Sequence, residues 1–142
     1  MRLPACLRVC CVAGAFLTSA CDLGTSIDDM PTSARVRVDG SAPEELRLIS
    51  SIDFIEQLNL ETGARSVLLL ESDTMVIDLP FDETIDVRQT GSVYVELLYT
   101  PSSLASVNLR VELDNGERFE QAATMSYGAQ LIYYWVWYGP AS

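Results

Sequence analysis

The stretch that decides the fold is residues 106–125, which read SVNLRVELDNGERFEQAATM. Over residues 106–113 apolar and polar side chains alternate, as in an antiparallel strand with one face in the core and the other in water. Residues 114–116 (DNG) are typical of a turn, and a second strand is expected to start at Glu117. The stretch therefore predicts a β-hairpin.

The pattern of side chains also predicts how the two strands of this hairpin pair. A two-residue Asn-Gly loop would place Leu113 opposite Arg118 and so mix apolar and charged side chains on one face. A three-residue loop, with Gly116 in the left-handed conformation, joins apolar residues to each other and opposite charges to each other. Its pairs are Val107 with Ala123, Arg110 with Glu120, Val111 with Phe119, and Glu112 with Arg118. Because a slip of one residue turns every side chain to the opposite face, we expect the three-residue loop.

Two more loops end in glycine, residues 61–63 (ETG) and 89–91 (QTG). Glycine suits a type I turn followed by a bulge, so each loop is expected to join the strands of a hairpin. For the second loop the expected pairs are Val87 with Val93 and Ile85 with Val95. Residues 67–70 (VLLL) are apolar on both faces, which indicates a central strand, and Pro80 is expected to end or bend a strand.

From residue 34 onward the chain has the pattern of short strands and turns. The expected strands are 34–38, 45–50, 52–60, 64–71, 74–79, 83–88, 92–99, 105–113, 117–125 and 129–138. Eight to ten short antiparallel strands predict an all-β protein, namely an antiparallel β-sandwich of immunoglobulin-like architecture. A small β-barrel is the alternative.

The N-terminus has the three parts of a secretory signal. Residues 1–8 contain two arginines and no acidic residue, residues 9–17 are apolar, and Ala20 is small. Residues 17–21 (LTSAC) resemble the lipobox of bacterial lipoproteins, and the resemblance is confined to this N-terminal part. It implies that Cys21 is lipidated and becomes the first residue of the mature protein. Ordinary cleavage after Ala20, which would give a secreted protein, is the alternative.

The chain is therefore expected to divide into three parts. Residues 1–20 form the signal peptide, residues 21–33 the lipidated cysteine with a flexible tether, and residues 34–142 the sandwich domain. Cleavage removes three of the four cysteines, so the mature protein has no intrachain disulfide. It also leaves 7 arginines against 20 acidic residues, a formal charge of −13. Such a surface repels phosphate backbones, so we expect no nucleic-acid partner.

Catalytic chemistry is restricted by two residue types that the sequence lacks. The chain contains no histidine and no lysine. This excludes serine–histidine and cysteine–histidine nucleophiles, lysine Schiff bases and the lysine of a phosphate-binding loop. Paired carboxylates, as in glycan hydrolases, are the remaining route to catalysis. We therefore expect a protein that is not an enzyme.

One group of acidic residues is a candidate metal site. Asp78, Asp82, Glu83 and Asp86 surround the bend expected at Pro80. Carboxylate oxygens are the ligands that Ca²⁺ prefers, although the spacing is not that of an EF-hand. A structural calcium ion is thus one interpretation and solvated carboxylates the other. No other cofactor is expected.

Residues 132–138 (IYYWVWY) are the most aromatic part of the chain. In a strand they divide between two faces: Tyr133, Trp135 and Trp137 on one, and Ile132, Tyr134, Val136 and Tyr138 on the other. If the second set enters the core, the first forms an outward stripe that can bind a protein, a glycan or lipid headgroups. The alternative is that Trp135 and Trp137 belong to the core or are covered by the tether or another strand.

These observations lead to one functional hypothesis and one alternative. The hypothesis is an exported protein, held in the bacterial cell envelope by a lipid on Cys21, on the periplasmic side or at the cell surface. Its sandwich would be a non-enzymatic binding or structural module with a protein or glycan partner. The alternative is a carbohydrate-binding module or a carboxylate-based glycan hydrolase at the cell surface.

Overall fold

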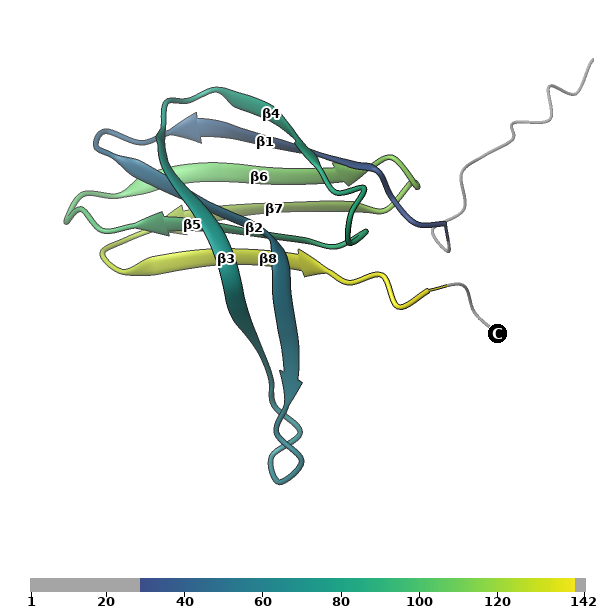
Figure 1. The fold of residues 1–142 in the computed structure, drawn as a ribbon. Coiled ribbons are helices and arrows are strands. Elements are labelled where there is room, and N and C mark those ends of the chain that lie inside the picture. Colours follow the sequence, from purple (N-terminus) through teal and green to yellow (C-terminus); the bar gives the residue numbers. More distant parts are fainter. Residues whose placement is uncertain (1–28, 140–142) are drawn as a thin grey trace, which may run out of the picture.

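The computed structural model describes residues 29–139, which form eight β-strands and no α-helix (Figure 1). The strands are β1 (Ser33–Ser41), β2 (Leu46–Leu58), β3 (Arg65–Ile77), β4 (Phe81–Asp86), β5 (Val93–Tyr99), β6 (Ala105–Leu113), β7 (Arg118–Met125) and β8 (Ala129–Trp135). They build two antiparallel four-stranded sheets, in the orders β4-β1-β6-β7 and β3-β2-β5-β8. The predicted β-sandwich is thereby confirmed. Its strand order differs from the ABED and CFG sheets of immunoglobulin domains.

The hairpin of β6 and β7 has the predicted register. Val111 lies opposite Phe119 and Arg110 opposite Glu120. Gly116 has a φ of 98°, a conformation that side chains with a Cβ rarely adopt, and its amide donates to the Leu113 carbonyl at 3.0 Å. The alternation of side chains therefore determined both the turn and the pairing.

The pairing expected across residues 89–91 is wrong. The strand β4 pairs with β1, whereas β5 pairs with β2 and β8, so residues 87–92 cross from one sheet to the other. Val87 and Val93 are both fully buried and reach the same core from different sheets. Alternation shows which side chains face the core, but it does not identify the neighbouring strand.

The second hairpin, β2 with β3, is longer than expected. Residues 45–50 and 52–60 belong to one strand, and residues 64–71 and 74–79 largely to another, because the ladder continues through a register irregularity at residues 50–54. Ser51 stabilises this irregularity, since its hydroxyl donates to the Glu71 carbonyl at 2.5 Å and accepts from the Asp53 amide at 3.1 Å. Pro80 stands between β3 and β4, as expected of a residue that ends a strand.

The strand β3 is an edge strand, and the expectation that residues 67–70 form a central strand is wrong. Beyond the irregularity, β2 and β3 continue as a two-stranded ribbon that projects from the sandwich (Figure 1). We call residues 53–71 the arm. Its apolar side chains are not covered by a second sheet, which is why the chain is apolar on both faces here without being central.

The core lies between the sheets and is built from alternate residues of the strands. Tyr99, Leu97 and Leu109 are among its largest fully buried side chains. Residues 29–32, expected to belong to the flexible tether, lie on this domain. The amide of Thr32 donates to Asp114 Oδ1 at 2.9 Å, and Asn115 Nδ2 donates to the Asp29 carbonyl at 3.0 Å.

Candidate functional site

The predicted lipidation site lies outside the described residues, as do the whole signal peptide and residues 21–28 of the tether. Cys21 therefore stays a prediction from the sequence. Within residues 29–139, no helix is long and apolar enough to cross a membrane.

The three rings expected to form an outward stripe do not share an exposed face. Tyr133 is only 8% exposed, and its ring stacks on Phe119 with centroids 4.6 Å apart. Trp135 is partly buried against the core, and the Trp137 amide donates to Ser92 Oγ at 3.2 Å. Trp135 therefore fits the alternative of a core residue, and Tyr133 is buried because Phe119 on β7 offers a stacking partner inside the sandwich. The outward residues of β8 are instead Ile132 and Tyr134.

The acidic residues around Pro80 are not gathered into one site. Arg35 binds Asp82, with its Nε 2.8 Å from Oδ1, and Arg88 binds Asp86, with its Nε 2.9 Å from Oδ1. Four residues of strand place Asp82 and Asp86 about 13 Å apart along β4. In the described part of the chain, no three acidic, histidine or cysteine residues come close enough to hold a metal ion. Neither Asp78 nor Glu83 joins these two pairs.

The arginine contacts change the ionisation of these carboxylates. Hydrogen bonds from Arg88 lower the pKa of Asp86 to about 2, from an ordinary value of 3.8. A hydrogen bond from Arg35 also lowers the pKa of Asp82. Both carboxylates are therefore ionised at neutral pH and already have a cation as partner.

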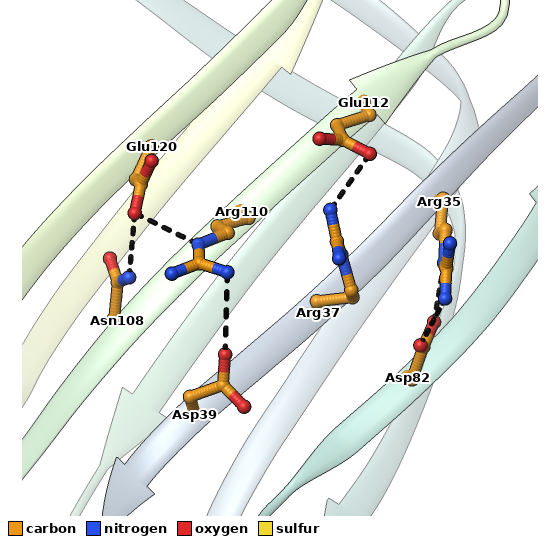
Figure 2. Close-up of polar contacts among 8 residues, drawn as sticks. All are labelled: Arg35, Arg37, Asp39, Asp82, Asn108, Arg110, Glu112 and Glu120. Carbon is orange, nitrogen blue, oxygen red and sulfur yellow. Dashed lines mark hydrogen bonds and ion pairs between the residues drawn. The ribbon is translucent and has the colours of Figure 1, made fainter.

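Figure 2 shows that this pairing extends across the outer face of the β4-β1-β6-β7 sheet. Arg37 reaches Glu112 at 2.8 Å, and Arg110 reaches Glu120 at 2.8 Å. The shared set, which we call the ion-paired face, consists of Arg35, Arg37, Asp39, Asp82, Asn108, Arg110, Glu112 and Glu120. Each charged side chain of this set therefore has a partner of opposite sign within the set.

The outer face of the β3-β2-β5-β8 sheet has a different character. The register places aliphatic and aromatic side chains at many of its outward positions, and we call this set the apolar face: Ile49, Val76, Tyr94, Leu98, Ile132 and Tyr134. Val76 is 55% exposed and Ile132 is 44% exposed. Polar residues, among them Arg47, Thr74 and Gln130, occupy other outward positions of the same sheet. Exposed apolar side chains in polar surroundings are typical of interaction surfaces.

The arm carries further exposed apolar side chains. Ile55 and Leu68 lie opposite each other, and each is 47% exposed. Leu58 and Leu70 are more than half exposed, and Leu60 in the loop at the tip is 89% exposed. The arm thus adds a second apolar surface beside the apolar face.

A cluster of aromatic rings and a carboxylate holds the arm to the sheet. The Phe54 ring packs on Tyr94 and Tyr134, with centroids 6.0 and 6.3 Å away. Glu56 accepts hydrogen bonds from the hydroxyls of Tyr138 and Tyr134, and from Arg65 at 2.9 Å. The bonds from Tyr138 and Arg65 lower the pKa of Glu56, which is therefore ionised at neutral pH.

A buried pair lies beneath this cluster. The Tyr94 hydroxyl donates to Glu96 Oε2 at 2.6 Å, and both side chains are more than nine-tenths buried. Burial is the largest cause that raises the pKa of Tyr94, and Glu96 adds to it. The phenol therefore stays protonated and gives the Glu96 carboxylate a donor.

Sequence reasoning missed this cluster. Glu56 and Tyr134 are 78 residues apart in the chain, and they meet because β2 and β8 belong to one sheet, on either side of β5. The sequence does indicate part of this cluster, because alternation places Tyr134 and Tyr138 on one face of the last strand. What the pattern could not decide was which face of that strand enters the core.

No protein-family model, no curated protein and no solved structure matches this chain. The described surface is therefore the only structural guide to its function. It offers one face closed by ion pairs, and one apolar face with a projecting arm.

Proposed function

We propose that this protein is a lipid-anchored protein of the bacterial cell envelope whose sandwich is a non-enzymatic binding module. The module docks a partner protein through the apolar face and the arm. The observation that carries this proposal is the contrast between the two outer faces: one has charges that pair with each other, and the other exposes Val76 and Ile132 beside the apolar side chains of the arm. Exposed apolar patches with polar surroundings mark interaction sites.

The anchor is supported by the sequence around Cys21. A basic start, a nine-residue apolar run and a small residue before the cysteine stand in the order of a lipoprotein signal. The tether between Cys21 and Asp29 is short, so the domain would stay close to the bilayer. The experiment is detergent phase partitioning of the full chain and Cys21→Ala, with Cys6→Ala as the matched control. We expect wild type and Cys6→Ala in the detergent phase and Cys21→Ala in the aqueous phase, whereas identical partitioning of all three contradicts an anchor at Cys21.

The binding role can be tested by hydroxyl-radical footprinting of the full chain, purified and in intact cells. Ile132 and Leu60 are exposed on the apolar face and the arm, and we expect less oxidation of both in cells because a partner covers them. Leu104 and Tyr127 are exposed in loops outside both surfaces, at 65% and 77%, and should be oxidised equally in both samples. Equal oxidation of all four residues would contradict docking through this surface.

Glycan binding is the second candidate, and the aromatic cluster favours it. Tyr138 is 77% exposed beside the Glu56 carboxylate, and sugar rings bind to exposed aromatic rings flanked by hydrogen-bonding groups. Titration calorimetry with soluble peptidoglycan fragments tests it: heat of binding that Tyr138→Ala abolishes would favour this candidate. Hydrolysis is less well supported, since an ionised Glu56 cannot act as a general acid.

A further inference from the structure

The outer edge of β3 in the arm is an open strand edge. The strand lies at the end of its sheet, and no strand within residues 29–139 pairs with its outer side. Residues 65–71 (RSVLLLE) form this part of the edge, with a single charge at either end and apolar side chains at the centre. Natural proteins usually protect such an edge with charged side chains, a covering segment or a partner strand.

A like-charge pair lies at the base of the arm. Asp53 lies across from Glu71 within the irregular part of the β2–β3 ladder, beside a hollow of about 210 Å³ lined by residues 50–53 and 71–73. Like charges in directly opposed positions destabilise a sheet. Within the described residues, no ion pair neutralises either carboxylate. A cation brought to this position from outside would remove the repulsion.

We propose that the edge of β3 pairs antiparallel with the same edge of a second copy of this chain, about a two-fold axis at Leu68. This inference names the partner for the arm and rests on the proposed binding role, but not on the lipid anchor. In this register Leu68 faces the partner's Leu68, Val67 faces the partner's Leu69, and Arg65 faces the partner's Glu71. Within each arm Arg65 already donates to Glu56 through one Nη, and its remaining N–H groups can reach the partner's Glu71. A two-fold axis repeats each contact, so one arginine reaches the acidic pair of each copy.

Other registers lose this match. If the axis moves to Leu69, Val67 lies opposite the partner's Glu71, and an apolar side chain meets a charge. If it moves to Val67, Arg65 lies opposite the partner's Leu69 and no cation reaches Glu71. Because side chains in a strand alternate with a period of two, one residue of slip is enough to break the pattern. Only the register centred on Leu68 joins charge to charge and apolar to apolar.

The pairing also covers exposed apolar surface. Ile55 lies opposite Leu68 within each arm, so the dimer has a continuous row of Ile55, Leu68, the partner's Leu68 and the partner's Ile55 across four strands. Ile55 and Leu68 are each about half exposed in the single chain. The second copy therefore fits by hydrogen bonding, charge and apolar contact together, as in recognition by strand addition.

Sedimentation equilibrium of the full chain in detergent tests the proposal by a charge swap. We expect a reversible dimer for the wild type, and a dissociation constant raised at least about tenfold in Glu71→Arg and in Arg65→Glu, because each single change places like charges opposite each other. The double variant, with Glu71→Arg and Arg65→Glu together, should recover the dimer. Arg88→Glu, which breaks an exposed ion pair on the other sheet, is the matched control and should leave the dimer unchanged.

Three outcomes would overturn the proposal. A monomeric wild type at every concentration would mean that the edge is free or belongs to a different protein. A dimer that neither single variant weakens would lie on another surface. A double variant that stays monomeric while its circular dichroism matches the wild type would show that Arg65 and Glu71 do not face each other. Partitioning of Cys21→Ala is measured separately, so failure of the anchor and failure of the dimer are distinguishable.

Discussion

The two outer faces of the sandwich are built alike and differ in what they show to water. Both sheets are antiparallel and four-stranded, and both give alternate residues to one core. On the β4-β1-β6-β7 sheet the outward positions carry charges that pair with one another. On the β3-β2-β5-β8 sheet they include Val76, Ile132 and Tyr134, and the arm adds Leu68. The difference teaches that the core is built from the inward residues of each sheet alone. The outward residues can therefore vary, and they can form a binding surface.

The largest effect on the free energy of unfolding is expected on β8, where neighbouring residues face opposite sides of the sheet. Tyr133 faces the core, whereas its neighbour Tyr134 faces outward. Tyr133→Ala removes a buried ring stacked on Phe119 and should lower the free energy of unfolding by about 3–5 kcal/mol. Tyr134→Ala removes a half-buried ring and should cost about 1 kcal/mol. Urea unfolding of the full chain measures both.

A third variant separates the contribution of the Tyr133 ring from that of its hydroxyl. The Tyr133 hydroxyl is buried, and no hydrogen-bond partner for it is present among the described residues. Tyr133→Phe should therefore leave the free energy of unfolding unchanged or raise it, since an unpartnered buried hydroxyl is costly. Equal losses in Tyr133→Ala and Tyr134→Ala would show that the two faces of β8 have been assigned to the wrong sides.

The pH dependence should distinguish the ion pair at the edge of one sheet from the buried tyrosine of the other, because Asp86 and Tyr94 titrate at opposite ends of the scale. The folded pKa of Asp86 is lowered to about 2, so its contribution is present above its ordinary pKa of 3.8 and is lost as the pH falls toward 2. The folded pKa of Tyr94 is raised, so its contribution is present below its ordinary pKa of 10 and is lost as the pH rises above it. Acid should weaken the Asp86–Arg88 pair beside the ion-paired face and also the Glu56 contacts of the arm, whereas alkali should act through Tyr94.

Two variants check this assignment by urea unfolding across the pH range. Asp86→Asn should make the acid limb slightly shallower, because Asp82, Glu56 and Glu120 still contribute to it, and should leave the alkaline limb as it is. Tyr94→Phe should flatten the alkaline limb, although it also removes the donor to Glu96 and lowers stability at neutral pH. An acid limb that is identical in Asp86→Asn and wild type would contradict the role given to Arg88.

The smallest effect is expected from the two ion pairs of one arginine. Arg110 contacts both Glu120 and Asp39 on an exposed surface, where ion pairs contribute little. Arg110→Met should lower the unfolding temperature slightly at low ionic strength, and about 1 M salt should abolish the difference from wild type. Ile132→Thr on the apolar face is the comparison and should show no dependence on salt. A salt-independent loss in Arg110→Met would mean that its aliphatic chain matters more than its charge.

Local patterns predicted part of this fold well. The hairpin of residues 105–125 follows from alternation and one glycine, because both partners of every pair are close in sequence. The crossing at residues 87–92 was predicted as a hairpin, because Val87 and Val93 face the core with the same periodicity whether or not their strands are neighbours. The sequence predicts β2 and β3 each as two shorter strands, because the irregularity at residues 50–54 interrupts the alternation without ending the ladder.

The candidate site was less accessible to such reasoning. Charges and apolar residues were visible, but the pairing of Arg37 with Glu112 depends on the contact of β1 with β6. The burial of Tyr133 depends on Phe119 reaching across from the other sheet. Both are long-range contacts, and one sequence contains no periodicity that specifies them.

Hydrogen exchange along the edge of β3, followed at several protein concentrations, tests most directly whether the arm is the surface through which this protein binds. Amides of residues 65–71 that point away from β2 should exchange rapidly in dilute samples and become protected as the concentration rises. Amides of β1 and β6, which lie inside their own sheet, should be protected equally at every concentration. Exchange at residues 65–71 that does not change with concentration would contradict pairing of the arm with a second copy.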